Sequence, residues 1–116
     1  MRVAGFGFRS GTGFSSLMAA LSPLGPVDAV ATVQAKTAGL RQIADHLRVP
    51  LLAVSPDELA LNPRSGSMRV ITLYGTGSVA ESAALAAAGQ GAVLVVSRTT
   101  SPDKTTVVAI AEGPGR

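Results

Sequence analysis

The stretch RVAGFGFRSGTGFSSLMAAL, Arg2 to Leu21, predicts a strand, a glycine-rich turn and a helix in succession. Residues 2–8 alternate small and apolar side chains, as in a buried strand, and the RSGTG that follows is typical of a turn. Apolar residues between 17 and 21 recur at spacings of three and four, which places them on one face of a helix that begins near Thr12 or Ser15. The chain therefore opens with one strand and one helix of an α/β domain.

The same alternation continues along the chain. Further strands are predicted at 27–33, 51–54, 92–97 and 105–111, helices at 40–47 and 77–88, a brief helix capped by Ser55 and Pro56, a loop at 62–67, and an extended or loop segment at 69–75. The last two strands are joined only by Arg98–Lys104, and a connection this short allows only an antiparallel pair. The sequence predicts one three-layer α/β/α domain, residues 1–116, with a mixed, mostly parallel sheet of about five strands and an antiparallel C-terminal hairpin.

Composition excludes several classes of protein. The 116 residues are 47% hydrophobic and 15% charged, which suits one packed domain. The chain has no cysteine and a single histidine, His46, so we expect neither disulfides nor a metal site. His46 lies beside Asp45 at the edge of a helical apolar face, and we expect a surface histidine. No window approaches about 18 uninterrupted apolar residues, and we expect a soluble, cytoplasmic protein.

The charge balance favours anionic partners. The formal net charge is +3 and the isoelectric point is about 10.2. However, the chain has no run of lysine and arginine, and three phenylalanines and one tyrosine offer few surfaces on which bases could stack. We therefore do not expect a nucleic acid as the partner.

Cationic and hydroxyl residues follow several of the predicted strands. In open α/β sheets, ligands bind outside the carboxyl ends of the strands. The residues expected there are Arg9, Ser10, Gly11, Thr12, Gln34, Lys36, Thr37, Gly75, Thr76, Gly77, Ser78, Arg98, Thr99 and Lys104. This set contains no histidine, cysteine or carboxylate pair for acid/base work, and glycine-rich turns before helices expose N–H groups. We therefore expect an anion-binding edge of the sheet, with Glu81 as the one nearby acid and a candidate for catalysis.

Gly75 to Ala80 also fits the relaxed dinucleotide pattern G-x-G-x-x-A, and Arg98 lies about 20 residues on, where an arginine could bind a 2′-phosphate. The pattern comes late in the chain, without the βαβαβ unit that a dinucleotide fold requires. NADP is kept as an alternative ligand. A third interpretation is that these small residues only let a helix pack closely on the sheet.

Four segments of the chain resemble one known family. They are GFGFRSGTGFSSLMAAL, ATVQAKTAGLRQIADHLRVPL, GTGSVAESAAL and SRTTSPDKTTVVAIAEG, which together span roughly residues 2 to 112. In this order they resemble the CobE / CbiG C-terminal domain family of cobalamin biosynthesis, with Lys36 at the family's lysine position. The resemblance implies a role in building the corrin ring. We expect the short, stand-alone CobE-like form, so the lactone opening linked to the longer CbiG protein is not carried over.

A corrin precursor is a macrocycle rimmed by carboxylates, which a protein would hold with cations and N–H donors. Arg9, Lys36, Arg98 and Lys104 could supply the cations, and the turns at 11–13 and 75–78 the N–H groups. We expect binding or presentation of this precursor, with no cofactor of the protein's own. The alternatives are an enzyme that acts on the precursor through Glu81 or Lys36, and an accessory subunit that docks another pathway enzyme. A homodimer is compatible with the sequence.

Overall fold

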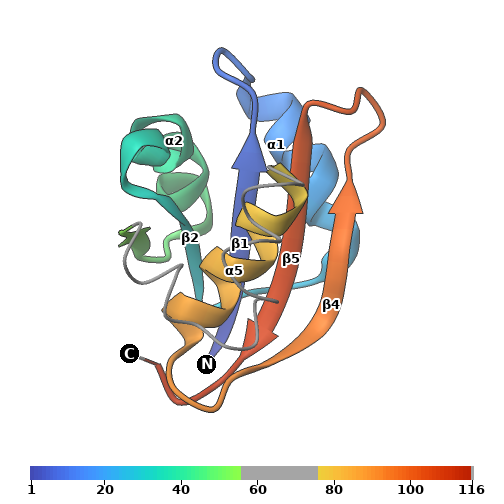
Figure 1. Ribbon diagram of the computed structural model, residues 1–116. Helices are drawn as coiled ribbons and strands as arrows, with labels where there is room; N and C mark the ends of the chain where they lie inside the picture. Colours follow the sequence, from blue (N-terminus) through green and yellow to red (C-terminus); the bar gives the residue numbers. More distant parts are fainter. Residues whose placement is uncertain (56–75, 116) are drawn as a thin grey trace.

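The computed structural model describes residues 1–55 and 76–115, which form one sheet covered by helices on both faces (Figure 1). The strands are β1 (Arg2–Phe8), β2 (Ala29–Val33), β3 (Leu51–Val54), β4 (Val93–Thr100) and β5 (Thr106–Glu112). The helices are α1 (Phe14–Leu21), α2 (Thr37–Leu47) and α5 (Thr76–Ala88), with 3₁₀ turns η1 (Ser22–Leu24) and η2 (Gln34–Lys36). The predicted short helix after Ser55 and the segments 62–67 and 69–75 lie outside the described residues.

The sheet has the order β3-β2-β1-β5-β4. Strands β1, β2 and β3 pair in parallel, whereas β5 is antiparallel to both β1 and β4. Four strands therefore run in one direction and β5 runs against them. The predicted α/β fold, with a mixed sheet and a C-terminal hairpin, is confirmed. The hairpin returns its second strand to the centre of the sheet, so that β4 forms the edge.

Helix α5 covers one face of the sheet, and α1 and α2 cover the other. The α5 face is built mostly from alanine, with Ala83, Ala84 and Ala87 fully buried. A Cβ atom on Gly5 of β1 would lie 2.8 Å from the Ala84 Cβ and closer still to the α5 backbone. The absence of a side chain at Gly5 therefore lets α5 lie directly on the middle of β1.

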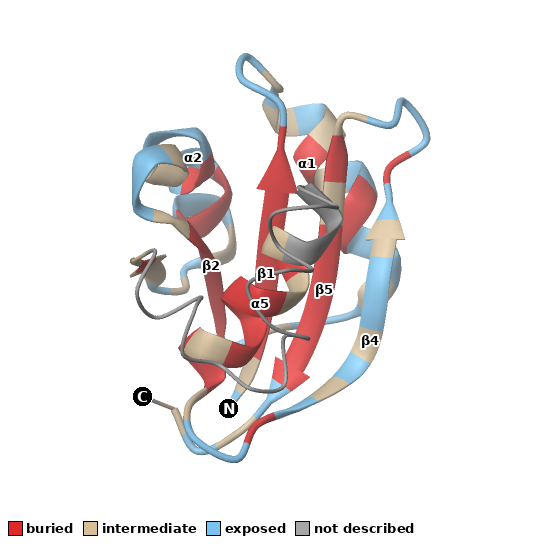
Figure 2. Cartoon of the chain, in the orientation of Figure 1, coloured by how far each residue is buried: buried red, intermediate tan, exposed pale blue. Residues whose placement is uncertain are grey.

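Larger side chains fill the opposite face. Phe6, Leu17, Leu40, Ile43 and Ile110 are fully buried there, between the sheet and the pair α1 and α2. Figure 2 shows the same layering, with β1 and β5 buried along most of their length and β4 largely exposed at the edge. The central position of β1 and β5 explains why both strands are apolar on both faces.

The observed strand β4 is longer than predicted. The sequence places its end at Ser97, whereas the strand continues to Thr100 and includes Arg98. Paired β-branched threonines prolong the ladder, because Thr99 and Thr100 lie opposite Val108 and Val107. The connection between the two strands is therefore shorter and tighter than the sequence indicates. In the part of the chain that the structure describes, no helix is long and apolar enough to span a membrane.

Candidate functional site

Three of the four predicted cations meet at the carboxyl end of β1. Arg9 follows the strand directly, and its backbone N–H donates to the carbonyl of Thr105 over 3.0 Å, which places Lys104 one residue away from this contact. Lys36 reaches the same point from η2, since its Nζ lies 2.6 Å from the carbonyl oxygen of Phe8. We call the surface formed by Arg9, Lys36, Lys104 and the loop 9–13 the β1 rim. It lies at the top of the molecule in Figure 1.

Lys36 has a structural contact as well as a charge. Besides its hydrogen bond to Phe8, the half-buried ammonium lies 5.2 Å from the centre of the Phe8 ring. The ring is in turn close to α2, because a Cβ on Gly39 would lie 2.6 Å from it. A lysine ammonium has three N–H donors, so two remain for a ligand after Phe8 is satisfied. Phe8 itself is only 6% exposed, so its ring offers a ligand little apolar surface.

The loop 9–13 is a tight turn that leads directly into α1. Thr12 donates to the carbonyl of Arg9 twice, from its hydroxyl over 2.6 Å and from its N–H over 3.1 Å. Gly11 adopts a φ of +84°, which glycine tolerates at little cost. Gly13 caps α1 without a side-chain hydrogen bond, and the first turn of α1 has no acidic residue. Because Gly13 provides no side-chain cap, the N-terminal N–H groups of α1 could meet an anion.

The hairpin turn on the other side of the rim is held by Asp103. Its carboxylate accepts hydrogen bonds from the Ser101 hydroxyl over 2.6 Å, from the Ser16 hydroxyl, and from the hydroxyl and N–H of Thr105 over 2.8 and 3.1 Å. These bonds to the charged form, from Ser101 first and then Ser16 and Thr105, hold the Asp103 pKa well below its usual range. Asp103 therefore stays ionised beside the cations.

The fourth predicted cation lies elsewhere. Arg98 belongs to the edge strand β4, two strands from β1, which is roughly 10 Å at standard strand spacing. Its backbone N–H donates to the half-buried Glu81 carboxylate on α5 over 3.3 Å, at an irregular part of the β4 ladder. Glu81 therefore satisfies a backbone donor of the edge strand. Its candidacy as a catalytic acid stays a prediction.

Only part of the predicted dinucleotide loop can be followed. Gly75 lies outside the described residues, and Gly77 and Ser78 belong to the first turn of α5. That first turn has no acidic residue. The interpretation of this segment as an anion-binding or NADP-binding loop therefore stays a prediction. The close contact between α5 and Gly5 supports the packing role that small residues of this helix were also expected to have.

His46 is exposed, as expected for a surface histidine, but its position is informative. Its ring lies edge-on against Phe14, with centroids 5.3 Å apart and planes at 80°. Phe14 is the first residue of α1, directly after the loop of the β1 rim. The only histidine of the chain thus lies near the rim. The sequence spacing of 32 positions contains no signal of this contact, because it depends on how α1 and α2 pack.

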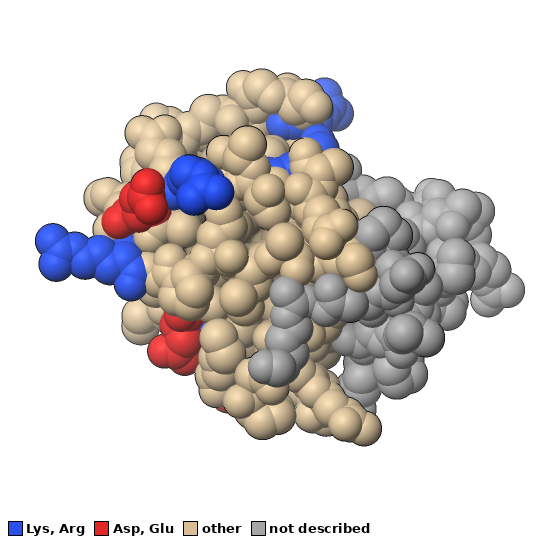
Figure 3. Space-filling model, turned by 90° about the vertical axis from the view of Figure 1, so that its left-hand side faces the viewer, with Lys and Arg blue, Asp and Glu red and all other residues tan. Residues whose placement is uncertain are grey.

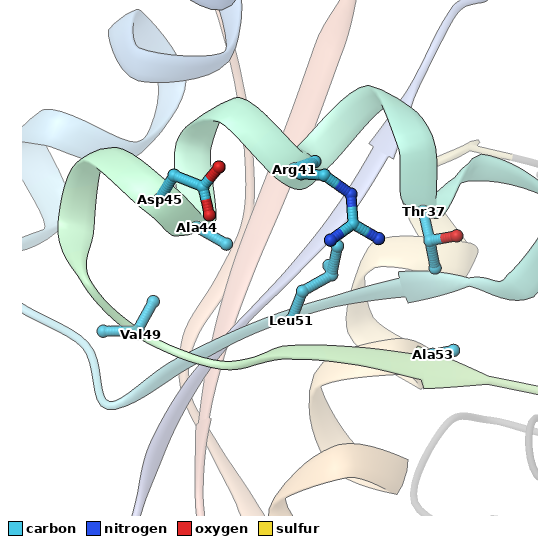
Figure 4. A pocket seen from close by; sticks show the side chains of 7 residues that line it. All are labelled: Thr37, Arg41, Ala44, Asp45, Val49, Leu51 and Ala53. Atoms are coloured by element: carbon cyan, nitrogen blue, oxygen red, sulfur yellow. The ribbon is translucent and has the colours of Figure 1, made fainter.

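Two shallow pockets lie away from the rim. One, of about 320 Å³, lies between α2 and β3 (Figure 4), where the Arg41 side chain extends toward Leu51 and Asp45 stands farther along the helix. The other, of about 370 Å³, has apolar walls from α1, η1 and the end of α2. Of the residues expected at the carboxyl ends of the strands, only Thr37 lines either of these two pockets.

The charge pattern of the described surface is sparse. Figure 3 shows the face that lies on the left-hand side of Figure 1. The charged side chains that reach the upper edge of this view are lysine or arginine, drawn in blue. Among the described residues, no group of three or more histidine, cysteine, aspartate or glutamate side chains lies close enough to hold a metal ion.

Comparison with known proteins gives a consistent result. A family model described as cobalamin synthesis G C-terminus matches residues 2–111. The crystal structure of the cobalamin biosynthesis protein chiG from Agrobacterium tumefaciens is 34% identical, covers 97% of this chain and 98% of its own, and has a TM-score of 0.72. The structure of CobE, a protein of the cobalamin biosynthetic pathway, is 31% identical, with 96% and 92% coverage and a TM-score of 0.72.

A third structure is similar in fold alone. A cobalamin biosynthesis protein G homolog from Sulfolobus solfataricus is 18% identical and has a TM-score of 0.74, and the match covers 99% of this chain but 37% of that one. No curated protein sequence matches the chain. Because the family model covers nearly all of the sequence and two full-length structures exceed 30% identity, the chain belongs to the cobalamin synthesis G C-terminus family and is a cobalamin biosynthesis protein of the CbiG/CobE type.

Proposed function

We propose that the chain binds and presents a polycarboxylate corrin precursor at the β1 rim. The observation that carries the proposal is the convergence of Arg9, Lys36 and Lys104, from three separate connections, on the end of one strand. These three residues are far apart in the sequence, and they are three of only ten lysines and arginines in the chain. A carboxylate placed among them would form charge-assisted hydrogen bonds, which are the strong ones.

The geometry suits several carboxylates better than one. The Arg9 side chain is exposed, and the 9–13 loop leads directly into the N-terminal N–H groups of α1. A macrocycle with acetate and propionate arms at its edge could contact the cations and these N–H groups through different arms. Phe14 and His46, whose rings pack together beside the loop, would supply apolar contact. The family's place in cobalamin biosynthesis makes a corrin the fitting polycarboxylate.

Binding would be tested with hydrogenobyrinic acid, a cobalt-free corrin polycarboxylate, followed by its absorbance at low and high salt. We expect saturable binding that weakens as salt rises, because exposed ion pairs are screened. Arg9→Ala should weaken this binding, whereas Arg48→Ala, an exposed arginine after α2, should leave it unchanged. Equal affinity in wild type and Arg9→Ala would contradict the proposal.

A parallel titration with NADPH, followed by nicotinamide fluorescence, addresses the alternative ligand. A response to NADPH with none to the corrin would transfer the function to the segment that begins at Gly75. The enzymatic alternative predicts consumption of the corrin, with turnover lost and binding kept in Glu81→Gln. Turnover that survives in Glu81→Gln would exclude Glu81 as the acid.

A further inference from the structure

An ionised carboxylate lies beside the cations of the β1 rim, where its charge opposes the binding of an anionic ligand. Asp103 is exposed and lies directly before Lys104 in the hairpin turn. A negative charge at this point lowers the local attraction for an anion. If the rim binds an anion, this carboxylate needs a role in the rim other than attracting the ligand.

The hydrogen bonds of Asp103 supply one. One carboxylate oxygen accepts from Ser16 in the first turn of α1, and the other accepts from Ser101 and Thr105 in the hairpin turn. Thr105 then accepts the N–H of Arg9 at its carbonyl. The loop 9–13 is thus tied to the hairpin turn at its start through Arg9, and the helix that follows it is tied there through Ser16.

The turn also fixes Lys104 in an unusual conformation. The Lys104 N–H donates to the Ser101 carbonyl over 2.9 Å, and Lys104 has a φ of +63°, in the left-handed region that glycine normally occupies. This backbone conformation sets the direction in which the Cα–Cβ bond of Lys104 leaves the turn. The Asp103 hydrogen bonds to Ser101 and Thr105, the residues on either side of this turn, maintain that conformation.

We propose that Asp103 is a positioning residue of the rim, which holds Arg9 and Lys104 in register by tying the first turn of α1 to the hairpin turn. The proposal rests on the proposed function, because the register matters only if the rim binds a ligand. Asp103 does not touch the ligand. It acts through the two cations, Arg9 and Lys104. Because these cations are already held in place before binding, the protein loses less conformational entropy when the ligand binds.

The substitution Asp103→Asn distinguishes an effect of the Asp103 charge on ligand affinity from an effect of its hydrogen bonds. Asp103→Asn removes a negative charge, so electrostatics alone predicts tighter binding of hydrogenobyrinic acid. Positioning predicts weaker binding, by about tenfold, the order of effect that loss of an outer-shell group has at other sites. Ser16→Ala keeps all charges and removes one tie, so only positioning predicts that it weakens binding as well.

The matched control is Asp28→Asn. Asp28 is also an exposed carboxylate that accepts a backbone N–H, from Arg2 over 2.7 Å, but it lies at the opposite end of β1. We expect its affinity to equal that of the wild type or exceed it slightly. Binding by Asp103→Asn that equals or exceeds that of Asp28→Asn would overturn the proposal. Should Asp103→Asn not fold, unchanged binding by Ser16→Ala would overturn it instead.

A second measurement separates this proposal from the proposed function. Amide hydrogen exchange in the absence of ligand should be faster for residues 9–16 in Asp103→Asn and Ser16→Ala, and unchanged for β2 and β3. If the wild type binds no corrin, the proposed function fails, and exchange still decides whether Asp103 orders the rim. Unchanged exchange in both variants would refute the positioning role.

Discussion

The ammonium of Lys36 donates a 2.6 Å hydrogen bond to the carbonyl oxygen of Phe8, which lies 28 residues earlier in the chain. Phe8 is the last residue of β1, the central strand of the sheet. The Lys36 ammonium provides a hydrogen-bond donor for the carbonyl group at this end of the strand. Lys36 is therefore part of the fold as well as of the β1 rim. Arg9, the neighbouring cation, makes no side-chain hydrogen bond or ion pair within the described part of the chain.

Because of this difference, we expect substitution of Lys36 to reduce both stability and corrin binding, and substitution of Arg9 to reduce corrin binding alone. Lys36→Met should reduce the free energy of unfolding by about 1–2 kcal/mol, because a charged donor to the Phe8 carbonyl is lost. It should also weaken corrin binding. Arg9→Ala should weaken binding with no change in stability. Urea denaturation and corrin titration of both variants measure the two effects, and a stable Lys36→Met protein would show that the hydrogen bond contributes little.

Gly5 should tolerate no larger residue. Gly5→Ala would bring a Cβ against the backbone of α5 near Ala80 and Ala84, and neither backbone can move without shifting the helix. We expect a loss of about 1–3 kcal/mol or more in the free energy of unfolding. Gly13→Ala is the control, because Gly13 has an ordinary φ of −88° and nothing within 4 Å of an added Cβ. Equal stability of the two variants would show that α5 can shift freely.

Lys104→Gly should make the protein more stable and less able to bind. A non-glycine residue at a φ of +63° costs about 1 kcal/mol or more, which glycine would recover. The substitution also removes one cation of the β1 rim. We expect a higher melting temperature together with weaker binding of hydrogenobyrinic acid. A variant that binds as tightly as the wild type would remove Lys104 from the site.

Asp103 should make stability depend on acid pH. Its hydrogen bonds depress the folded-state pKa below the usual 3.8, so the ionised carboxylate stabilises the folded state above that value. The contribution is lost as the pH falls below about 4, where the unfolded chain gains a proton that the folded chain resists. The melting temperature of the wild type should exceed that of Asp103→Asn by a constant amount above about pH 5, and the two should converge toward pH 2. A difference independent of pH would contradict this assignment.

Several features of the fold could be predicted from local patterns. The bounds of β1 were predicted correctly, since six consecutive small or apolar residues, Val3 to Phe8, precede a glycine-rich turn. Helix α2 begins at Thr37, three residues before the predicted start at Leu40. The spacing of its apolar residues predicted the buried face correctly, including Ile43 and Ala44. The length of β4 was underestimated, because its last three residues are polar and are held by pairing with β5.

The site was predicted as a set of residue types at one edge of the sheet. The structure brings three members of that set, Arg9, Lys36 and Lys104, to the end of β1. The set also included Arg98, which lies on the far strand, and it omitted Asp103 and Ser16, whose hydrogen bond joins residues 87 positions apart. A spacing of this size leaves no trace in a local pattern.

The sequence by itself determined the elements, their buried faces and the positive character of the chain, because periodicity and charge are local properties that each segment carries alone. The tertiary structure decided that β5 returns to lie beside β1, and this pairing places Lys104 next to Arg9 and Asp103 within reach of α1. Strand order follows from the need to bury both faces of the whole sheet at once. No single segment contains that requirement, so only the folded chain reveals which cations lie close together.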